Sequence, residues 1–212
     1  MHVDAAMAGT AMLLPECRHL WLGVEGADSV SWNPHKWMGA ILDCSLFYVR
    51  DTQHLIRTMS TSPTYLQSSV DGQVRQYRDW GIPLGRRFRS LKLWFQLELE
   101  GIDAIRARIR RDLENALWFA EQVEQTADWH VVAPVNLQTV CIRHEPENMD
   151  SAALDDHNRK WVAEINASGQ AFMSPAKVGD KWLVRVSVGV ESTTREHLNT
   201  LWQLIQSTVE KA

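Results

Sequence analysis

The chain has 212 residues, of which 45% are hydrophobic and 23% are charged, and its formal net charge is -4. This composition is ordinary for a globular protein of one large domain or two smaller parts, and the negative charge does not favour nucleic acid or an anionic membrane as a partner. The sequence lacks a run of about 18 apolar residues, which excludes a transmembrane helix, and its start lacks the regions of a signal peptide.

The first hundred residues predict a partial sheet. Residues 2–6 and 28–32 are each typical of a short buried strand, and residues 43–49 (Asp-Cys-Ser-Leu-Phe-Tyr-Val) are rich in strand-forming residues. Residues 61–85 are rich in Ser, Thr, Gln and Gly, contain two prolines and have no clear periodicity. A connection this long is usually functional or disordered, and we predict that its first half is a mobile lid.

Helices and strands follow in the remainder. A helix is predicted from about Phe88 to Glu100, with Gly101 ending it, and apolar residues at helical spacing predict a long connector helix from Ile102 to about Ala120. Residues 129–133, 137–143 and 182–188 are strand-like, and residues 151–168 are helical. A capping-box pattern, Thr193 with Glu196, is expected to begin the last helix.

The three cysteines, Cys17, Cys44 and Cys141, are far apart and have no Cys-x-x-Cys spacing. This pattern favours reduced thiols in a cytoplasmic protein over a disulfide framework or a zinc site. We therefore predict no metal centre.

Two short motifs point to chemistry. Residues 31–37 read Ser-Trp-Asn-Pro-His-Lys-Trp, which places Lys36 after a proline-restricted turn and between two tryptophans that can exclude water. An amine held in an apolar pocket becomes a nucleophile for carbonyl groups. Residues 2–6 read His-Val-Asp-Ala-Ala, and Asp4 is suited to face a cationic ring nitrogen. A lysine that forms a Schiff base and an aspartate that binds a pyridinium nitrogen are the minimal equipment for pyridoxal phosphate.

A third segment, residues 77–95, reads Tyr-Arg-Asp-Trp-Gly-Ile-Pro-Leu-Gly-Arg-Arg-Phe-Arg-Ser-Leu-Lys-Leu-Trp-Phe. In this order the three motifs resemble the group II decarboxylases that use pyridoxal 5'-phosphate, above all the aromatic-L-amino-acid decarboxylase family. The resemblance covers essentially the whole chain but only the C-terminal part of the family. It implies an α/β fold, the C-terminal portion of a fold-type I (aspartate-aminotransferase-like) enzyme. Residues 1–100 would be a partial cofactor-binding large domain that holds the three strands in one sheet, and residues 101–212 a connector helix and a small α/β domain.

The resemblance implies catalytic roles for Lys36, Asp4, His35 and Tyr65. Lys36 would form the Schiff base with the cofactor, and Asp4 would stabilise the protonated ring nitrogen. His35 would contact the phosphate or relay a proton to Lys36. Tyr65 would protonate the substrate carbon after carbon dioxide leaves. Relatives that make aldehydes carry phenylalanine at the matching position, so tyrosine favours simple decarboxylation to an amine.

The cofactor-binding residues implied by the resemblance include a small residue, Ala6, against one face of the ring. The full set is Asp4, Ala6, Ser29, Asn33, His35 and Lys36. The chain departs from relatives at Gln67-Ser68, where a Lys-His pair is frequent, so substrate preference or loop closure is expected to differ. Arg78, Arg86 and Arg87 are predicted to pack the base of the loop and to pair with carboxylates.

The predicted function is decarboxylation of an aromatic L-amino acid to the amine, and the resemblance implies a homodimer in the full-length form. Two alternatives stay open. In the first, the chain is a truncated, catalytically incomplete lobe that needs a separate N-terminal half. In the second, the substrate is a non-aromatic amino acid. The residues that shape the side-chain pocket are expected largely in that other half, so the sequence does not select the amino acid.

Overall fold

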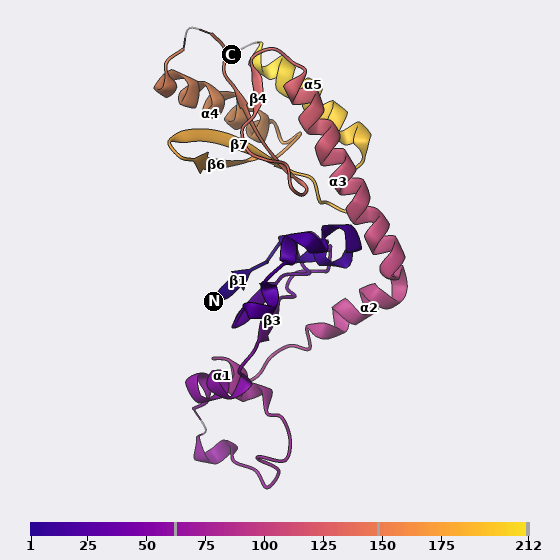
Figure 1. Ribbon diagram of the computed structural model, residues 1–212, viewed down its shortest axis with the longest axis vertical. Coiled ribbons are helices and arrows are strands. Elements are labelled where there is room, and N and C mark those ends of the chain that lie inside the picture. Colours follow the sequence, from indigo (N-terminus) through magenta and orange to yellow (C-terminus); the bar gives the residue numbers. More distant parts are fainter. Residues whose placement is uncertain (62, 148, 211–212) are drawn as a thin grey trace. The chain divides into compact units, whose positions relative to one another are not determined.

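Two sheets, each in its own structural unit, organise the chain (Figure 1). The computed structural model describes residues 1–61, 63–147 and 149–210. Its first unit comprises Met1–Ile102 and its second unit Asp103–Ala212. No helix in these described ranges is long and apolar enough to cross a membrane.

The sheet of the first unit has the order β1-β2-β3. It is formed by β1 (His2–Asp4), β2 (Ser29–Trp32) and β3 (Leu46–Val49), with β1 parallel and β3 antiparallel to β2. The prediction of three strands in one sheet is confirmed. The prediction that residues 2–6 are a buried strand is wrong for β1, where His2 and Asp4 are exposed, because these side chains point to an open polar face of the sheet.

Three 3-10 helices that the sequence analysis did not predict connect β1 to β2. They are η1 (Ala8–Leu13), η2 (Pro15–Trp21) and η3 (Val24–Gly26), and with β2 and β3 they line an apolar pocket. Gly9 packs against Trp32 so closely that an added Cβ would lie 2.5 Å from Trp32 Cδ1. The face of the sheet that bears Trp32 is therefore its covered, apolar face.

Two α-helices complete the first unit. The sequence analysis missed α1 (Thr52–Met59), whose first turn is capped by Asp51 through a 2.9 Å bond from the His54 N–H. The helix predicted from about Phe88 to Glu100 is confirmed as α2 (Ser90–Glu100). It ends at Gly101, which has φ of 75° and donates its N–H to the Leu97 carbonyl at 3.1 Å. Two short 3-10 helices, η4 (Thr64–Leu66) and η5 (Tyr77–Trp80), lie between them in sequence.

The second unit begins with the long helix α3 and continues as an antiparallel sheet with two further helices. The elements are α3 (Ile102–Glu124), β4 (Trp129–Val131), β5 (Thr139–His144), α4 (Ser151–Ser168), β6 (Ser174–Val178), β7 (Lys181–Ser187) and α5 (Arg195–Val209). The strand order is β4-β5-β7-β6. The predicted helix at 151–168 has the bounds of α4, and the predicted strands near 129, 137 and 182 correspond to β4, β5 and β7.

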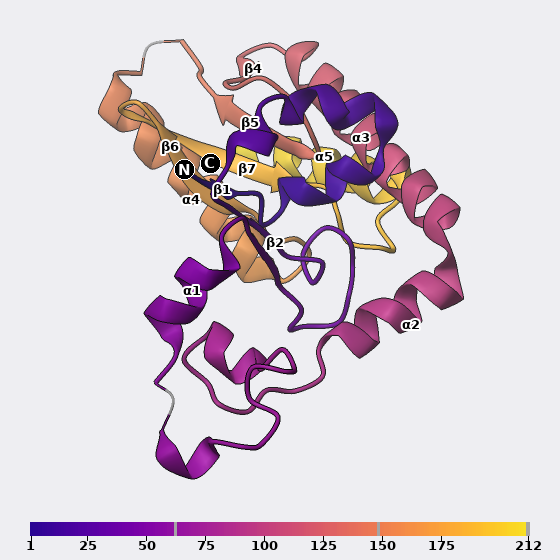
Figure 2. The ribbon, with the colours of Figure 1, turned by 60° about the horizontal axis from the view of Figure 1, so that its bottom comes forward.

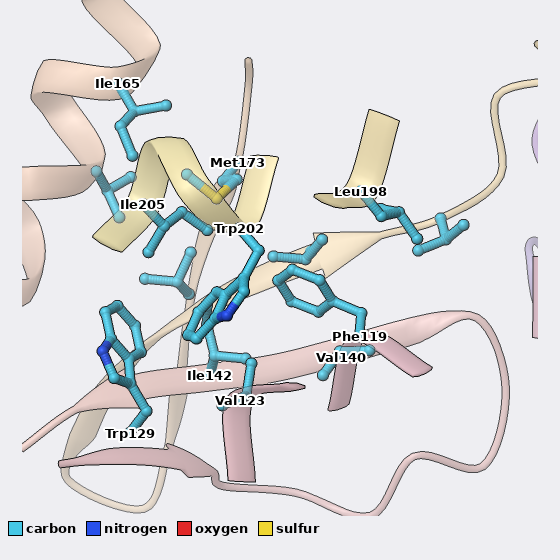
Figure 3. Close-up of a cluster of buried hydrophobic side chains, with 14 of the residues drawn as sticks. Phe119, Val123, Trp129, Val140, Ile142, Ile165, Met173, Leu198, Trp202 and Ile205 are labelled. Atoms are coloured by element: carbon cyan, nitrogen blue, oxygen red, sulfur yellow. The ribbon is translucent and has the colours of Figure 1, made fainter. Parts of the chain in front are cut away.

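Aromatic side chains form the centre of the second unit's core (Figure 3). Trp202 of α5 meets Phe119 of α3 edge-on, with centroids 5.7 Å apart, and Trp129 of β4 at 5.0 Å. Trp129 also packs edge-on against Trp161 of α4 at 5.5 Å. These pairs join all three helices to the sheet through geometries that aromatic rings favour.

Two details of the second unit differ from the sequence predictions. Strand β6 was missed because it is short and contains Pro175, which only an edge strand tolerates. The capping box of α5 is formed by Thr194 and His197, so the predicted pair of Thr193 and Glu196 is one residue too early. His197 Nδ1 accepts the Thr194 N–H at 3.1 Å, which supplies the acceptor that was expected from a glutamate.

Candidate active site

The carboxyl ends of β1 and β2 meet at one edge of the first sheet, because the two strands are parallel. Asp4 is paired with Ser31, and the backbone pairing continues beyond the strands. The Ala5 N–H donates to the Ser31 carbonyl, and the Asn33 N–H donates to the Ala6 carbonyl, both at 2.9 Å. The edge that follows parallel strands is where α/β sheets bind ligands.

One face of this edge is polar. His2, Asp4, Ser29 and Ser31 share it, because side chains alternate along each strand and the register pairs His2 with Ser29. His2 Nδ1 lies 2.8 Å from Ser29 Oγ, and Ser31 Oγ donates to Asp4 Oδ1 across 3.4 Å. Asp4 Oδ1 also accepts the Ala6 N–H at 3.0 Å. The Asp4 carboxylate is thus oriented by two donors and exposed to a ligand.

Lys36 lies in a tight turn after β2. Its N–H donates to the Asn33 carbonyl at 2.9 Å, and its carbonyl accepts the Gly39 N–H at 3.0 Å. The Asn33 side chain accepts a hydrogen bond from Ser45 Oγ. These bonds fix the backbone of the turn within a few residues of the polar edge.

The predicted apolar enclosure of Lys36 is wrong for this chain, because Lys36 is exposed. Neither flanking tryptophan covers it. Trp32 points to the other face of the sheet, where its Nε1–H donates to Thr10 Oγ1 at 3.1 Å, and Trp37 is only 2% exposed. The two rings therefore anchor the turn in the first unit and leave the lysine amine open.

His35 is tied to the strand side of the same loop. Its ring Nδ1 lies 2.6 Å from the Cys44 carbonyl oxygen and 3.0 Å from the Cys44 backbone nitrogen. The backbone N–H of His35 donates to the same carbonyl at 3.3 Å. With Nδ1 engaged, Nε2 is the ring nitrogen that remains for a ligand. Burial raises the pKa of the Cys44 thiol, so it stays neutral beside the histidine.

Helix α2 braces the loop that follows Lys36. Gln96 Nε2 donates to the Met38 carbonyl at 2.9 Å, and Lys92 Nζ donates to the Leu42 carbonyl at 3.3 Å. Arg89 Nε donates to Asp43 Oδ2 at 2.8 Å, and this bond lowers the pKa of the Asp43 carboxyl. The inner side of α2 therefore holds the loop from Met38 to Asp43 in place.

Tyr65 lies apart from this edge. It belongs to η4, is 76% exposed, and has no contact with Lys36 among the residues that the structure describes. Both views of the first unit place its segment on the far side of α1 from the sheet (Figures 1 and 2). The structure thus brings Asp4, Ala6, Asn33 and the Lys36 turn together and leaves Tyr65 outside that group.

Arg78 does pack the base of the loop, as predicted. Its Nη1 donates to the Leu66 carbonyl at 2.7 Å, and its Nη2 lies 3.2 Å from Asp71 Oδ1. The Arg86 guanidinium lies 5.9 Å from the centroid of the Tyr77 ring. The pairing of Arg86 and Arg87 with carboxylates stays a prediction.

The side chains at the polar edge fit pyridoxal phosphate. The open amine of Lys36 suits an aldehyde, the Asp4 carboxylate suits a protonated ring nitrogen, and Ala6 leaves room beside a flat ring. Hydroxyl and amide groups of Ser29 and Asn33 add neutral hydrogen-bonding partners. No group of three or more His, Cys, Asp or Glu side chains that could hold a metal occurs in the described part of the chain.

The sequence analysis missed Ser31 and Ser45, which orient Asp4 and Asn33. For Ser31 a signal exists. Ser29, Ser31 and Asn33 alternate with period two, so a strand that carries Ser29 to one face must carry Ser31 there as well. No local pattern marks Ser45, because it is twelve residues from Asn33 and only the fold of the intervening loop brings the two side chains together.

Comparisons with known proteins show which family the chain is similar to. The family profile for the pyridoxal-dependent decarboxylase conserved domain matches residues 1–145. The chain is 38% identical over its whole length to an aromatic-L-amino-acid decarboxylase of Drosophila lebanonensis, covering 51% of that protein. It is 39% identical to a phenylacetaldehyde synthase of Arabidopsis thaliana, with 97% of this chain and 42% of that protein covered.

Among solved structures, that of Oryza sativa TDC with PLP and tryptamine superposes with a TM-score of 0.92 at 36% identity. The matched region covers 99% of this chain and 44% of the Oryza sativa chain. The predicted partial fold-type I arrangement and the resemblance are confirmed. The chain spans about half the length, or less, of the curated relatives that it matches.

Proposed function

Because the chain belongs to the pyridoxal-dependent decarboxylase family, we propose that it supplies the lysine-bearing part of an enzyme that decarboxylates an aromatic L-amino acid to the amine and carbon dioxide. The observation that carries this proposal is the meeting of Asp4 and the Lys36 turn at the carboxyl edge of β1 and β2. Pyridoxal phosphate, when bound, supplies an electron sink for the bond that breaks as carbon dioxide leaves.

Lys36 is the residue that attaches the cofactor through its amine. Its turn is held by the Asn33 carbonyl on one side and by α2 on the other, so the backbone presents the side chain from a fixed position. Asp4 holds a proton on the ring nitrogen, because a carboxylate favours the charged form of a cation beside it. Ser31 and the Ala6 N–H keep that carboxylate aimed at the open face.

The remaining cofactor contacts come from the same face and turn. Ala6 packs beside the ring, and Ser29 and Asn33 bind polar groups around it. His35 contacts the phosphate or passes a proton to the lysine amine through Nε2, because its Nδ1 is engaged by Cys44.

Tyr65 is the proton donor to the substrate carbon in this proposal. Its phenol is exposed on η4, so it can approach a site from outside the sheet edge. The approach requires movement of its segment or a site presented by another subunit. The homodimer that we propose for the full-length form would satisfy this requirement.

An aromatic amino acid is the favoured substrate. This chain is similar over its whole length to an aromatic-L-amino-acid decarboxylase, and the Oryza sativa structure holds tryptamine, an aromatic amine. A non-aromatic amino acid is the alternative. The three cysteines form no disulfide with one another in the described part of the chain, which supports the proposal of a reducing, cytoplasmic setting.

The second candidate is that this chain forms one lobe of an active site, which another polypeptide completes. Lys36 is exposed, and in this candidate a further polypeptide that covers the turn supplies the desolvation that activates the lysine. The outer side of α2 exposes apolar side chains that a further chain would cover, among them Leu91, Trp94, Phe95 and Leu99.

An assay separates the two candidates. The purified chain is mixed with pyridoxal phosphate and L-tryptophan, L-tyrosine or L-glutamate, and amine and carbon dioxide are measured, with Lys36→Ala as control. Amine from the aromatic substrates alone supports the first candidate. Cofactor attachment to Lys36 without amine supports the second, and amine from the Lys36→Ala variant would contradict both.

A further inference from the structure

Four residues close a ring of hydrogen bonds around the segment that follows Tyr65. Asp71 accepts the Ser68 N–H at 2.9 Å and the Ser68 hydroxyl at 3.0 Å. Arg78 reaches the same carboxylate at 3.2 Å and donates to the Leu66 carbonyl at 2.7 Å. Arg78 thereby connects the Leu66 carbonyl, directly after Tyr65, to the Asp71 carboxylate.

Other contacts fix the far side of this ring. Gln76 Nε2 donates to Asp71 Oδ1 at 3.3 Å, and Gly72, with φ of 84°, makes the turn directly after Asp71. Asp79 lies 3.9 Å from Arg78 Nε and accepts the hydroxyl of Ser60, the residue that ends α1. The ring is therefore anchored to a helix of the first unit.

Tyr65 itself contributes no hydrogen bond to this arrangement in the described residues and remains 76% exposed. Its position is therefore set by its backbone. Two backbone hydrogen bonds of η4 hold that backbone, from the Leu66 N–H to the Pro63 carbonyl at 3.0 Å and from the Gln67 N–H to the Thr64 carbonyl at 3.3 Å, and the side-chain contacts to Leu66 and Ser68 fix it from outside. The ring joins three pairs of residues: Ser68 with Asp71, Asp71 with Arg78, and Arg78 with Leu66. Asp71 takes part in the first two pairs. The hydrogen bonds from Ser68 lower the pKa of the Asp71 carboxyl, which agrees with an ionised acceptor.

We propose that Asp71 is a positioning residue for Tyr65: through Ser68 and Arg78 it holds the backbone from Leu66 to Ser68 so that the phenol is presented in one orientation. The proposal deepens the role proposed above for Tyr65 and rests on it. It also explains how a loop with Gln67-Ser68 keeps its form, because the Ser68 hydroxyl is one of the groups that Asp71 binds.

The test uses Asp71→Ala and the milder Asp71→Asn. Gln73→Ala is the matched control in the same loop, since the substitution removes a long, 3.4 Å side-chain hydrogen bond to the Ser69 carbonyl and keeps the backbone bond of Gln73 to Val70. Amide hydrogen exchange is measured over residues 64–71. We expect at least about tenfold faster exchange in Asp71→Ala and little change in Gln73→Ala, because hydrogen bonds to a charged acceptor are lost only in the first.

A second readout follows the phenol itself. The chain has three tyrosines, Tyr48, Tyr65 and Tyr77, so 3-fluorotyrosine labelling gives three ¹⁹F resonances, and Tyr65→Phe identifies one of them. Asp71→Ala should move the Tyr65 resonance toward its position in the unfolded chain and leave that of Tyr48 in place. Unchanged exchange together with an unchanged Tyr65 resonance would overturn the proposal, whatever the activity.

A double-mutant cycle in the catalytically competent assembly separates this proposal from that for Tyr65. If Asp71 acts through Tyr65, Asp71→Ala lowers the rate of amine formation about tenfold in the parent and has no further effect together with Tyr65→Phe. Equal effects in both backgrounds would contradict positioning through the phenol. If Tyr65→Phe alone changes nothing, the role of Tyr65 fails, while exchange and the ¹⁹F resonance still decide whether Asp71 holds the loop.

Discussion

The Ser31 hydroxyl donates to the Asp4 carboxylate across the parallel pair β1–β2, with Oγ and Oδ1 3.4 Å apart. This bond joins the two strands on the polar face of the sheet, and the Lys36 turn comes directly after β2. It makes the direction of the Asp4 carboxylate a property of the sheet rather than of one flexible side chain. Cofactor binding should therefore respond to both residues, and more strongly to the one that bears charge.

Replacing Asp4 by asparagine should weaken pyridoxal phosphate binding by about tenfold or more, because a hydrogen bond to a charged group is worth ~1.5–3 kcal/mol. Ser31→Ala should weaken it less, since it removes only one neutral donor to the carboxylate. Fluorescence titration with the cofactor measures both. Asp103→Asn, whose side chain is 94% exposed in the other unit, is the matched control. Equal affinity in Asp4→Asn and the control would contradict the role of Asp4.

Tyr65→Phe should change the product more than the binding of substrate. Removing the phenol takes away the proposed proton donor, so the amine should fall by about 10²–10⁴-fold, the contribution typical of a general acid, and aldehyde should rise. Chromatography of amine and aldehyde from L-tyrosine measures the ratio. Tyr48→Phe serves as the control because Tyr48 lies on β3, on the apolar face of the sheet. An unchanged product ratio would remove Tyr65 from the mechanism.

Trp202→Ala should destabilise the second unit by about 3–5 kcal/mol, the range for truncating a large aromatic side chain in a core. Trp202 contacts Phe119 and Trp129 and is 5% exposed (Figure 3). Leu117→Ala on α3 is the control, because Leu117 is 53% exposed and should change stability by no more than about 0.5 kcal/mol. Urea unfolding followed by circular dichroism tests this, and equal midpoints for both variants would be the contrary result.

Stability of the second unit should fall as the pH drops from about 6.5 toward 4. Burial, and then the charge of His157, lower the pKa of His144 to about 4, and burial also lowers that of His157. The unfolded chain binds more protons than the folded one between these values, so stability is complete above pH ~6.5 and declines below it. Asp128 opposes the shift of His144, His130 adds to it, and Lys160 lowers the pKa of His157.

We expect a loss of about 1–2 kcal/mol across this window, because solvent screening reduces the full value of ~1.4 kcal/mol per pKa unit at a half-exposed ring. Urea midpoints at pH 7 and pH 5 measure it. His144→Gln should flatten the dependence, whereas His54→Gln, at an exposed position on α1, should not. A pH profile unaffected by His144→Gln would show that other groups control it.

Sequence reasoning located the elements whose signals are local. Helix α4 follows from the capping aspartate at 150 and continuous apolar spacing, and Gly101 marks the end of α2 because its positive φ suits glycine. The 3-10 helices between β1 and β2 are too short to establish a period, and β6 contains a proline that argues against a strand.

The surroundings of Lys36 could not be read from its neighbours in sequence. Trp32 is four residues away, but strand alternation sends it to the face opposite Ser31, and Trp37 is buried beneath the turn. Adjacency along the chain therefore predicted an enclosure that the fold does not make. The pairing of Asp4 with Ser31 was equally hidden, because 27 residues separate them and only the register of β1 and β2 brings them together.

The most direct test of the central claim is to trap the cofactor on the chain. The purified protein is mixed with pyridoxal phosphate, treated with borohydride, digested and analysed by mass spectrometry. We predict a reduced cofactor adduct on Lys36 that is absent from Lys36→Ala and weaker in Asp4→Asn. A folded protein that gives no adduct on Lys36, or carries it equally on Lys92 and other lysines, would contradict the assignment of this edge of the sheet as the cofactor site.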